Sequence, residues 1–243
     1  MLTQPVVHVV DDDPAIIRLL TELAKAMELD VQTYQSAEEF LAAYEPSGPG
    51  CLVLDVRVPG ISGMELQKRL TAAGITLPIT FVTGHADVRM AVEAMERGAF
   101  GFLEKPFRIQ ELCEKIQNAV RSDIAAWRRR EGQEDASRRL ARITPAQRRV
   151  ADLVVAGQTS KMIAQELGLS VRTVEAQRAG LMRRLGIGCR TELVRLMAAV
   201  ASCGIDEQRT VTRREGAVPL LQNKNGDGPR VIHSPCLSGR DSA

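Results

Sequence analysis

A chain of 243 residues can hold one large domain or two smaller ones, and its 44% hydrophobic and 26% charged residues are typical of a soluble globular protein. No apolar run approaches the roughly 20 residues of a membrane-spanning helix, and no basic and apolar leader of the secretory kind stands at the start. The five cysteines are scattered and never form a CxxC pair. This pattern argues against a disulfide framework or a zinc site and favours a cytoplasmic location.

The charge is unevenly distributed along the chain. Residues 1–122 contain 11 Lys and Arg against 17 Asp and Glu, whereas the remainder contains 21 against 13. An acidic half joined to a basic half suggests two modules with different partners, and the basic module is the candidate for contact with nucleic acid.

Short apolar runs alternate with amphipathic stretches up to about residue 122. The apolar runs lie at 6–10, 30–34, 51–55, 79–83 and 101–105. Helical patterns lie near 14–27, 36–44, 63–73, 87–97 and 109–121. Such alternation predicts a parallel sheet with helices on both faces, and ligands of these sheets bind at the carboxyl ends of the strands.

Polar residues follow four of these predicted strands. Asp11, Asp12 and Asp13 follow the first, Asp55 ends the third, Thr83 ends the fourth and Lys105 ends the fifth. Each alone has an ordinary explanation as a helix cap or a turn residue. Together they form a site where Mg2+ could offset the repulsion between carboxylates and where an aspartate could accept a phosphoryl group.

The segments VVDDDP, LDVRVPGISGMEL, FVTGHADVRMAVEAM and GFLEKPF resemble the receiver domain of two-component response regulators, specifically the FixJ branch. The resemblance covers residues 4 to about 122 without a gap. It implies a flavodoxin-like α/β fold whose five-stranded parallel sheet has the order 2-1-3-4-5. It also implies a separate sensor histidine kinase that phosphorylates Asp55.

Further roles follow from the same resemblance. It implies Mg2+ as cofactor, held by Asp11, Asp12, Asp55 and the backbone carbonyl of Arg57. Thr83 and Lys105 would contact the phosphoryl oxygens, and Phe102 occupies the aromatic switch position. We expect phosphorylation to remodel the surface formed by the fourth helix, the strand 101–104 and the fifth helix, so that the chain forms a homodimer.

The segment from 122 to 143 is rich in charge and in helix formers. We expect a charged, partly helical linker over 123–143, with Gly132 as a break. The basic run at 128–130 could contact phosphates, but a charge run of this kind is usually a solvated helix face.

The next segment contains clear signals for where helices begin and end. Thr144, Pro145 and Gln147 form an N-cap, a first-turn proline and a capping-box partner. Gly157 ends that helix; a short helix closed by Gly168 and a third helix, capped by Ser170 and ended by Gly186, follow. Two short helices around a glycine-bounded turn, the second with a basic outer face, predict an all-α helix-turn-helix domain.

The segment SKMIAQELGLSVRTVEAQRAGLMRRLG resembles the LuxR/FixJ/NarL-type DNA-binding domain, over roughly 140–200. In that family the helix at 171–185 enters the major groove of promoter DNA. By position, Glu175, Ala176, Arg178 and Ala179 would face base edges, and Lys161, Arg172, Thr173 and Arg183 would lie near phosphates. Gln177 stands where the family often has His or Val, which leaves the base preference open.

The chain is thus expected to have a receiver at 1–122, the linker at 123–143, a DNA-binding domain at 144–203 and a disordered tail at 204–243. The predicted function is that of a transcription factor switched by phosphorylation of Asp55, with no membrane partner. The alternative is a phosphorylation-controlled module whose helical domain binds protein instead of DNA. An enzyme with a regulatory receiver is disfavoured, because residues 123–243 contain no nucleotide-binding glycine loop and no nucleophile–base constellation.

Overall fold

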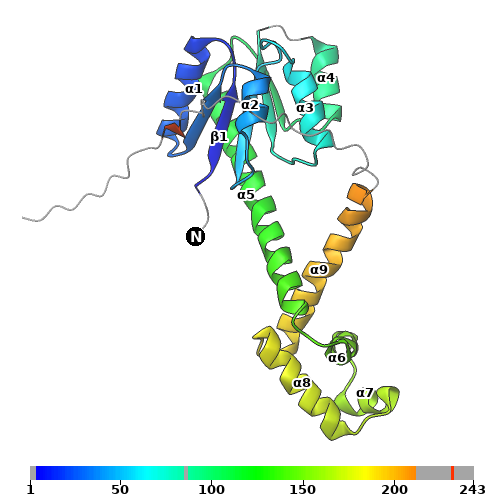
Figure 1. The fold of residues 1–243 in the computed structure, drawn as a ribbon. Helices are drawn as coiled ribbons and strands as arrows, with labels where there is room; N and C mark the ends of the chain where they lie inside the picture. Colours follow the sequence, from blue (N-terminus) through cyan, green and yellow to red (C-terminus); the bar gives the residue numbers. More distant parts are fainter. Residues whose placement is uncertain (1–3, 85–86, 212–230, 233–243) are drawn as a thin grey trace, which may run out of the picture. The chain divides into compact units, whose positions relative to one another are not determined.

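A computed structural model of the chain describes residues 4–84, 87–211 and 231–232, with side chains as far as residue 201. The chain divides into two compact units. The first comprises residues up to Trp127 together with the short strand Val231–Ile232, and the second comprises Arg128–Thr212. Figure 1 shows the elements of each unit.

The first unit contains the predicted parallel sheet. Its parallel strands are β1 (Val6–Val10), β2 (Asp30–Tyr34), β3 (Gly50–Leu54), β4 (Ile79–Thr83) and β5 (Gly101–Glu104). Their spatial order is β2-β1-β3-β4-β5, which confirms the flavodoxin-like fold. Val10 pairs with Leu54 in the register of β1 and β3, so the residues that follow these two strands emerge side by side.

A sixth strand, β6 (Val231–Ile232), pairs antiparallel with the outer edge of β2. The expectation of a disordered tail did not include this strand. An edge strand offers unpaired backbone groups, and an extended segment with β-branched residues can pair with them. The rest of the tail beyond Val211 lies outside the described residues.

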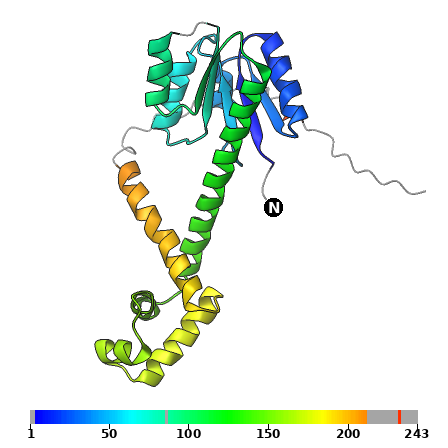
Figure 2. The ribbon, with the colours of Figure 1, turned by 180° about the vertical axis from the view of Figure 1, so that it is seen from behind.

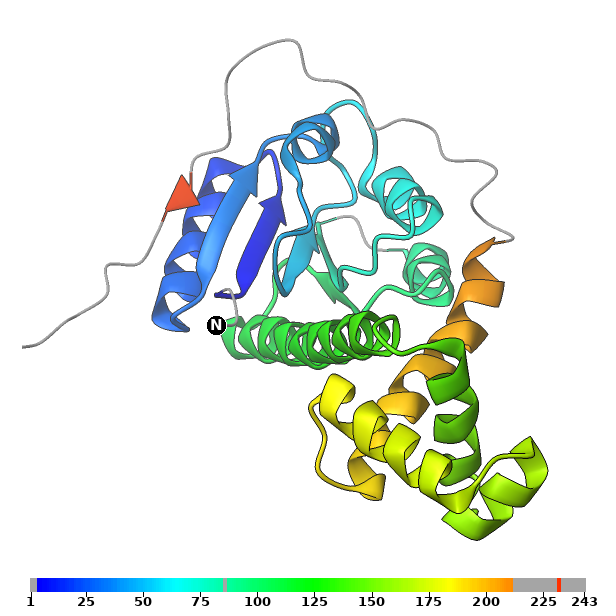
Figure 3. The ribbon, with the colours of Figure 1, turned by 60° about the horizontal axis from the view of Figure 1, so that its bottom comes forward.

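Helices cover both faces of the sheet, and Figures 2 and 3 show these layers from two further directions. They are α1 (Pro14–Ala26), α2 (Ala37–Ala43), α3 (Gly63–Ala72), α4 (Val88–Glu96) and the first part of α5 (Ile109–Leu140). Alternate strand residues face opposite helix layers. Leu54 packs in the core beneath α2 and α3, whereas its neighbour Val53 packs in the core beneath α1 and α5.

The helix α5 differs from the expected linker. It runs without interruption through Gly132, so the prediction of a break at this residue is wrong. A single glycine costs about 1 kcal/mol relative to alanine in a helix. Ala136 and Leu140 are buried in the core of the second unit, and this burial together with the helix-forming neighbours outweighs that cost.

The second unit is all-helical, as predicted. It contains α6 (Pro145–Val155), α7 (Ser160–Leu167), α8 (Val171–Leu185) and α9 (Arg190–Val211). Thr144 and Gln147 form the predicted capping box, and Gly168 and Gly186 end α7 and α8 in the left-handed conformation. The helix α9 continues eight residues past the expected boundary at 203, because extending an existing helix is easier than starting one.

The core of the second unit is formed by apolar residues of all four helices together with the end of α5. Val174, Leu181 and Leu185 form the buried stripe of α8. Val150 and Ile163 contribute from α6 and α7. This stripe fixes which face of α8 points outward.

Candidate functional site

The carboxyl ends of β1, β3, β4 and β5 bring the predicted residues of the first unit together. Lys105 Nζ lies 2.7 Å from Asp11 Oδ2 and 2.8 Å from Asp55 Oδ2. Asp11 is 2% exposed and Asp55 8% exposed, so both carboxylates are nearly removed from water. Pairing with the ammonium offsets the cost of burying them.

The second oxygen of each carboxylate accepts a hydrogen bond from a backbone amide. Asp13 donates its N–H to Asp11 Oδ1 at 2.9 Å, and Arg57 donates its N–H to Asp55 Oδ1 at 2.9 Å. One oxygen of each aspartate therefore faces a loop amide and the other faces Lys105. Charge-assisted hydrogen bonds of this kind fix the orientation of both side chains.

The electrostatics of the site reflect a balance between burial and pairing. Burial raises the pKa of the Asp11 carboxyl, against the hydrogen bonds from Lys105 and Asp13, which lower it. Burial lowers the pKa of Lys105, but hydrogen bonds and attraction to Asp11 and Asp55 outweigh it and raise the pKa overall. Lys105 therefore stays an ammonium at neutral pH and supplies a fixed positive charge at the sheet edge.

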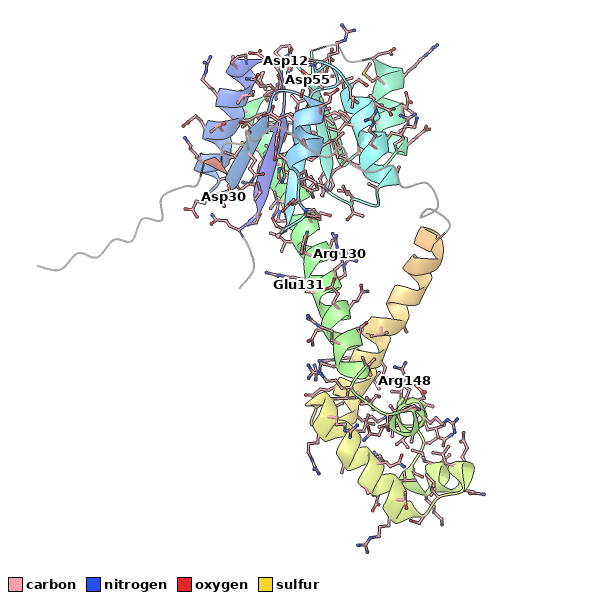
Figure 4. The ribbon with its side chains drawn as sticks, viewed as in Figure 1. Asp12, Asp30, Asp55, Arg130, Glu131 and Arg148 are labelled. Atoms are coloured by element: carbon pink, nitrogen blue, oxygen red, sulfur yellow. The ribbon has the colours of Figure 1, made fainter. Side chains whose placement is uncertain are left out.

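Asp12 lies at the same edge of the sheet as Asp55, whereas Asp30 lies at the opposite end (Figure 4). Unlike Asp11, Asp12 is exposed. Carboxylate and carbonyl oxygens are the ligands that Mg2+ prefers, so this set of donors fits the cation chemically. In the part of the chain that the structure describes, no three acidic, His or Cys side chains are grouped closely enough to hold a metal. Instead, the Lys105 ammonium donates hydrogen bonds to Oδ2 of Asp11 and to Oδ2 of Asp55.

Thr83 and Phe102 complete the predicted set. Thr83 ends β4, is fully buried, and accepts a hydrogen bond at its backbone carbonyl from the Lys105 amide at 2.8 Å. Phe102 is half-buried on β5, and its ring lies 6.1 Å from that of Phe81, tilted by 38°. Thr83 therefore lies on the strand next to β3, and Phe102 lies on the strand beyond it.

In the second unit, the outer face of α8 carries most of the residues predicted to contact DNA. The exposed ones are Arg172, Thr173, Glu175, Ala176, Ala179 and Arg183, with Lys161 exposed on α7. Arg178 is half-buried, and its Nη1 donates to Ser160 Oγ at 2.8 Å. Of this set, Arg178 is thus the residue that also holds α8 against α7.

Several basic residues have scaffold contacts that the sequence pattern did not reveal. Arg139 donates to the carbonyl of Leu185 at the end of α8, and Arg190 donates to the carbonyl of Val154 at 3.0 Å. Cations near helix C-termini satisfy carbonyls that lack partners within the helix. Part of the positive charge of this unit therefore stabilises its fold.

A receiver-type fold with this carboxylate–lysine site, in one chain with a helix-turn-helix unit, defines a DNA-binding response regulator. The model of the response regulator receiver domain matches residues 7–117, and that of bacterial regulatory proteins of the luxR family matches residues 141–197. The chain belongs to the FixJ-type family of transcriptional response regulators, which is a family of regulators and not of enzymes.

Individual relatives agree with this assignment. The transcriptional regulatory protein FixJ of Azorhizobium caulinodans is 41% identical over 197 residues, which cover 80% of this chain and 93% of that protein. The solved structure of the response regulator StyR has a TM-score of 0.74 at 37% identity, covering 81% of this chain and 99% of that one. Full-length FixJ from B. japonicum gives a TM-score of 0.50 at 37% identity, covering 83% and 99%.

None of the described helices is both long enough and apolar enough to span a bilayer.

Proposed function

We propose that Asp55 accepts a phosphoryl group from a partner histidine kinase and that this event controls binding of α8 to promoter DNA. The observation that carries the proposal is the bridge from Lys105 Nζ to Asp55 Oδ2 at 2.8 Å. It holds a carboxylate nucleophile beside a fixed cation at an otherwise buried sheet edge. Phosphoryl transfer depends mainly on such positioning and charge neutralisation.

In the transfer step, a carboxylate oxygen of Asp55 attacks phosphorus while the bond from phosphorus to the kinase histidine breaks. The histidine nitrogen keeps the bonding electrons and takes up a proton. Lys105 and the Thr83 hydroxyl contact the oxygens of the phosphoryl group that is now on Asp55. Asp11, Asp12, Asp55 and the carbonyl of Arg57 would hold Mg2+, which would supply positive charge to offset the negative charge of the phosphoryl group.

Dimerisation is assigned to the surface formed by α4, β5 and the start of α5. Val88, Val92 and Met95 share one face of α4 and are 79%, 51% and 48% exposed. Phe100 and Ile109, beside β5 and at the first position of α5, are also exposed. An apolar surface of this kind supports association with a second copy once Thr83 and Phe102 respond to the phosphoryl group.

The domain limits form part of the proposal. We assign the receiver to residues 1–122 and the DNA-binding domain to 144–203. The helical stretch over 123–140, the second half of α5, connects them.

Treatment of the full-length chain with acetyl phosphate and Mg2+, followed by peptide mass mapping, tests the acceptor. We expect a phosphoryl adduct on the peptide containing Asp55 and none in Asp55→Asn. An adduct elsewhere would contradict the assignment. DNA binding that weakens steeply with salt supports the second half of the proposal, whereas no binding at low salt would favour a protein-binding module.

A further inference from the structure

The loop between β3 and α3 follows directly from Asp55 and is closed tightly at its base. Gly63 donates its N–H to the carbonyl of Val56 at 3.0 Å. A Cβ atom at Gly63 would lie 2.3 Å from the carbonyl oxygen of Asp55, so a side chain cannot fit there. The end of the loop at Gly63 is thus hydrogen-bonded to the residue that follows Asp55 and lies close against the Asp55 backbone.

The tip of this loop is held by a side chain from another helix. Ile61 donates its N–H to Glu38 Oε1 at 2.9 Å, across 23 residues of sequence. Gly60 has a φ of +75°, and a Cβ atom there would lie 2.3 Å from Glu38 Oε1. The Glu38 carboxylate therefore packs directly on Gly60 and accepts from the amide that follows it.

Glu38 is well placed to act as a fixed anchor. It lies in the first turn of α2, where a carboxylate interacts favourably with the helix dipole. Its neighbours Ala37 and Phe40 are fully buried in the core, and Ser36 caps the helix. The helix that carries Glu38 is thus held firmly by packing.

We propose that Glu38 is a positioning residue for phosphorylation, which holds the β3–α3 loop in the conformation that the Asp55 site needs. This inference rests on the proposed function. Arg57 belongs to the same loop: its N–H orients Asp55, and its carbonyl is a proposed ligand of Mg2+. Without Glu38 the loop samples other conformations, and Arg57 spends less time in place.

The test compares full-length wild type with Glu38→Ala, Glu38→Gln and Asp123→Ala. Asp123 is a matched control, because its Oδ2 accepts from the Gly50 amide at 2.9 Å at the other end of β3. Two quantities are measured: the hydrogen-exchange rate of the Ile61 amide without Mg2+, and the Mg2+ concentration that half-saturates phosphorylation by acetyl phosphate.

We expect Glu38→Ala to raise the half-saturating Mg2+ concentration about tenfold, equivalent to about 1.4 kcal/mol, with little change in the rate at saturating Mg2+. Exchange of the Ile61 amide should accelerate. Glu38→Gln should stay within about twofold of wild type, because its Oε1 can still accept the bond. Asp123→Ala should lower the unfolding midpoint in urea without changing the Mg2+ dependence.

Wild-type Mg2+ dependence in Glu38→Ala would overturn the inference, and so would an equal shift in Asp123→Ala. Should Glu38→Ala fail to fold, Gly60→Ala disturbs the same contact from the loop side and should shift the Mg2+ dependence in the same direction. Absence of an adduct in wild type would instead overturn the proposed function itself, and the inference with it.

Discussion

The Nζ atom of Lys105 lies 2.8 Å from Oδ2 of Asp55, although the two residues are 50 positions apart in the sequence. Parallel strands bring them together, because β3 and β5 end at the same edge of the sheet. The same ammonium reaches Asp11, so a single cation balances two buried carboxylates. Lys105 thus has a structural role that precedes any contact with a phosphoryl group.

Replacing this cation tests that role. We expect Lys105→Met to lower the free energy of unfolding by about 3 kcal/mol at neutral pH without Mg2+, because two buried carboxylates lose their partner. Urea unfolding measures the change. Millimolar Mg2+ should recover part of the loss in the variant and have a smaller effect on wild type. Equal stability of the two proteins would show that the carboxylates need no counter-charge.

The buried His8 predicts a dependence of stability on acid pH. It is 7% exposed, contacts the Tyr34 hydroxyl through Nδ1 and lies among aromatic rings. Burial lowers its pKa from 6.5 to about 4. Between these two pH values His8 is protonated in the unfolded chain but stays neutral in the folded chain. Stability is therefore lost as the pH falls from about 6.5 to about 4, by about 3 kcal/mol in total.

Urea unfolding of wild type and His8→Gln over this pH range isolates the effect, because the other titrating groups are shared. The difference in stability between the two proteins should shrink as the pH falls. A constant difference would mean that His8 titrates alike in the folded and unfolded chains.

Gly132 offers a stabilising substitution. It lies within α5, and a Cβ atom there would meet no heavy atom within 4 Å. We expect Gly132→Ala to stabilise the helix by up to about 1 kcal/mol, because glycine loses more backbone entropy on folding. Thermal unfolding followed by circular dichroism measures it. Gly63→Ala, which would meet the Asp55 carbonyl, should destabilise the protein, and an equal response of both variants would be inconsistent with this geometry.

Substitutions on the exposed face of α8 should distinguish a residue that contributes to overall DNA affinity from one that determines base preference. With an operator selected from random DNA, we expect Arg172→Ala to weaken binding uniformly and to reduce the slope of log affinity against log salt by about 1. Glu175→Ala should instead change the preference at one base pair by about 1–3 kcal/mol. Titrations at several salt concentrations and with base-substituted operators measure both. Interchanged effects would show that the assigned roles of these residues are wrong.

The parallel sheet and the grouping of Asp11, Asp55 and Lys105 were predictable, because apolar periodicity and turn residues are local signals and a parallel topology then brings the strand ends together. The order of the strands, by contrast, was implied by the resemblance to receiver domains. The roles of Glu38 and Asp123 were not predictable. Each accepts a hydrogen bond from a backbone amide far away in the sequence, and no local pattern marks such a contact. The predicted helix break at Gly132 does not occur, because the neighbouring residues favour a helix strongly enough to continue it.

Arginines that stabilise the fold and arginines that are proposed to contact DNA also look alike in sequence. Arg139 and Arg190 bond to helix carbonyls, whereas Arg172 and Arg183 are exposed on α8. The three-dimensional position of helix ends decides between the two roles, and this position depends on tertiary packing.

Native mass spectrometry of the full-length chain after treatment with acetyl phosphate and Mg2+ tests the central claim most directly, since it records adduct and oligomeric state together. We expect wild type to gain one phosphoryl group and to form a dimer, Asp55→Asn to do neither, and Val92→Glu to gain the adduct but stay monomeric. An adduct or dimer in Asp55→Asn equal to that of wild type would contradict a switch that operates through Asp55.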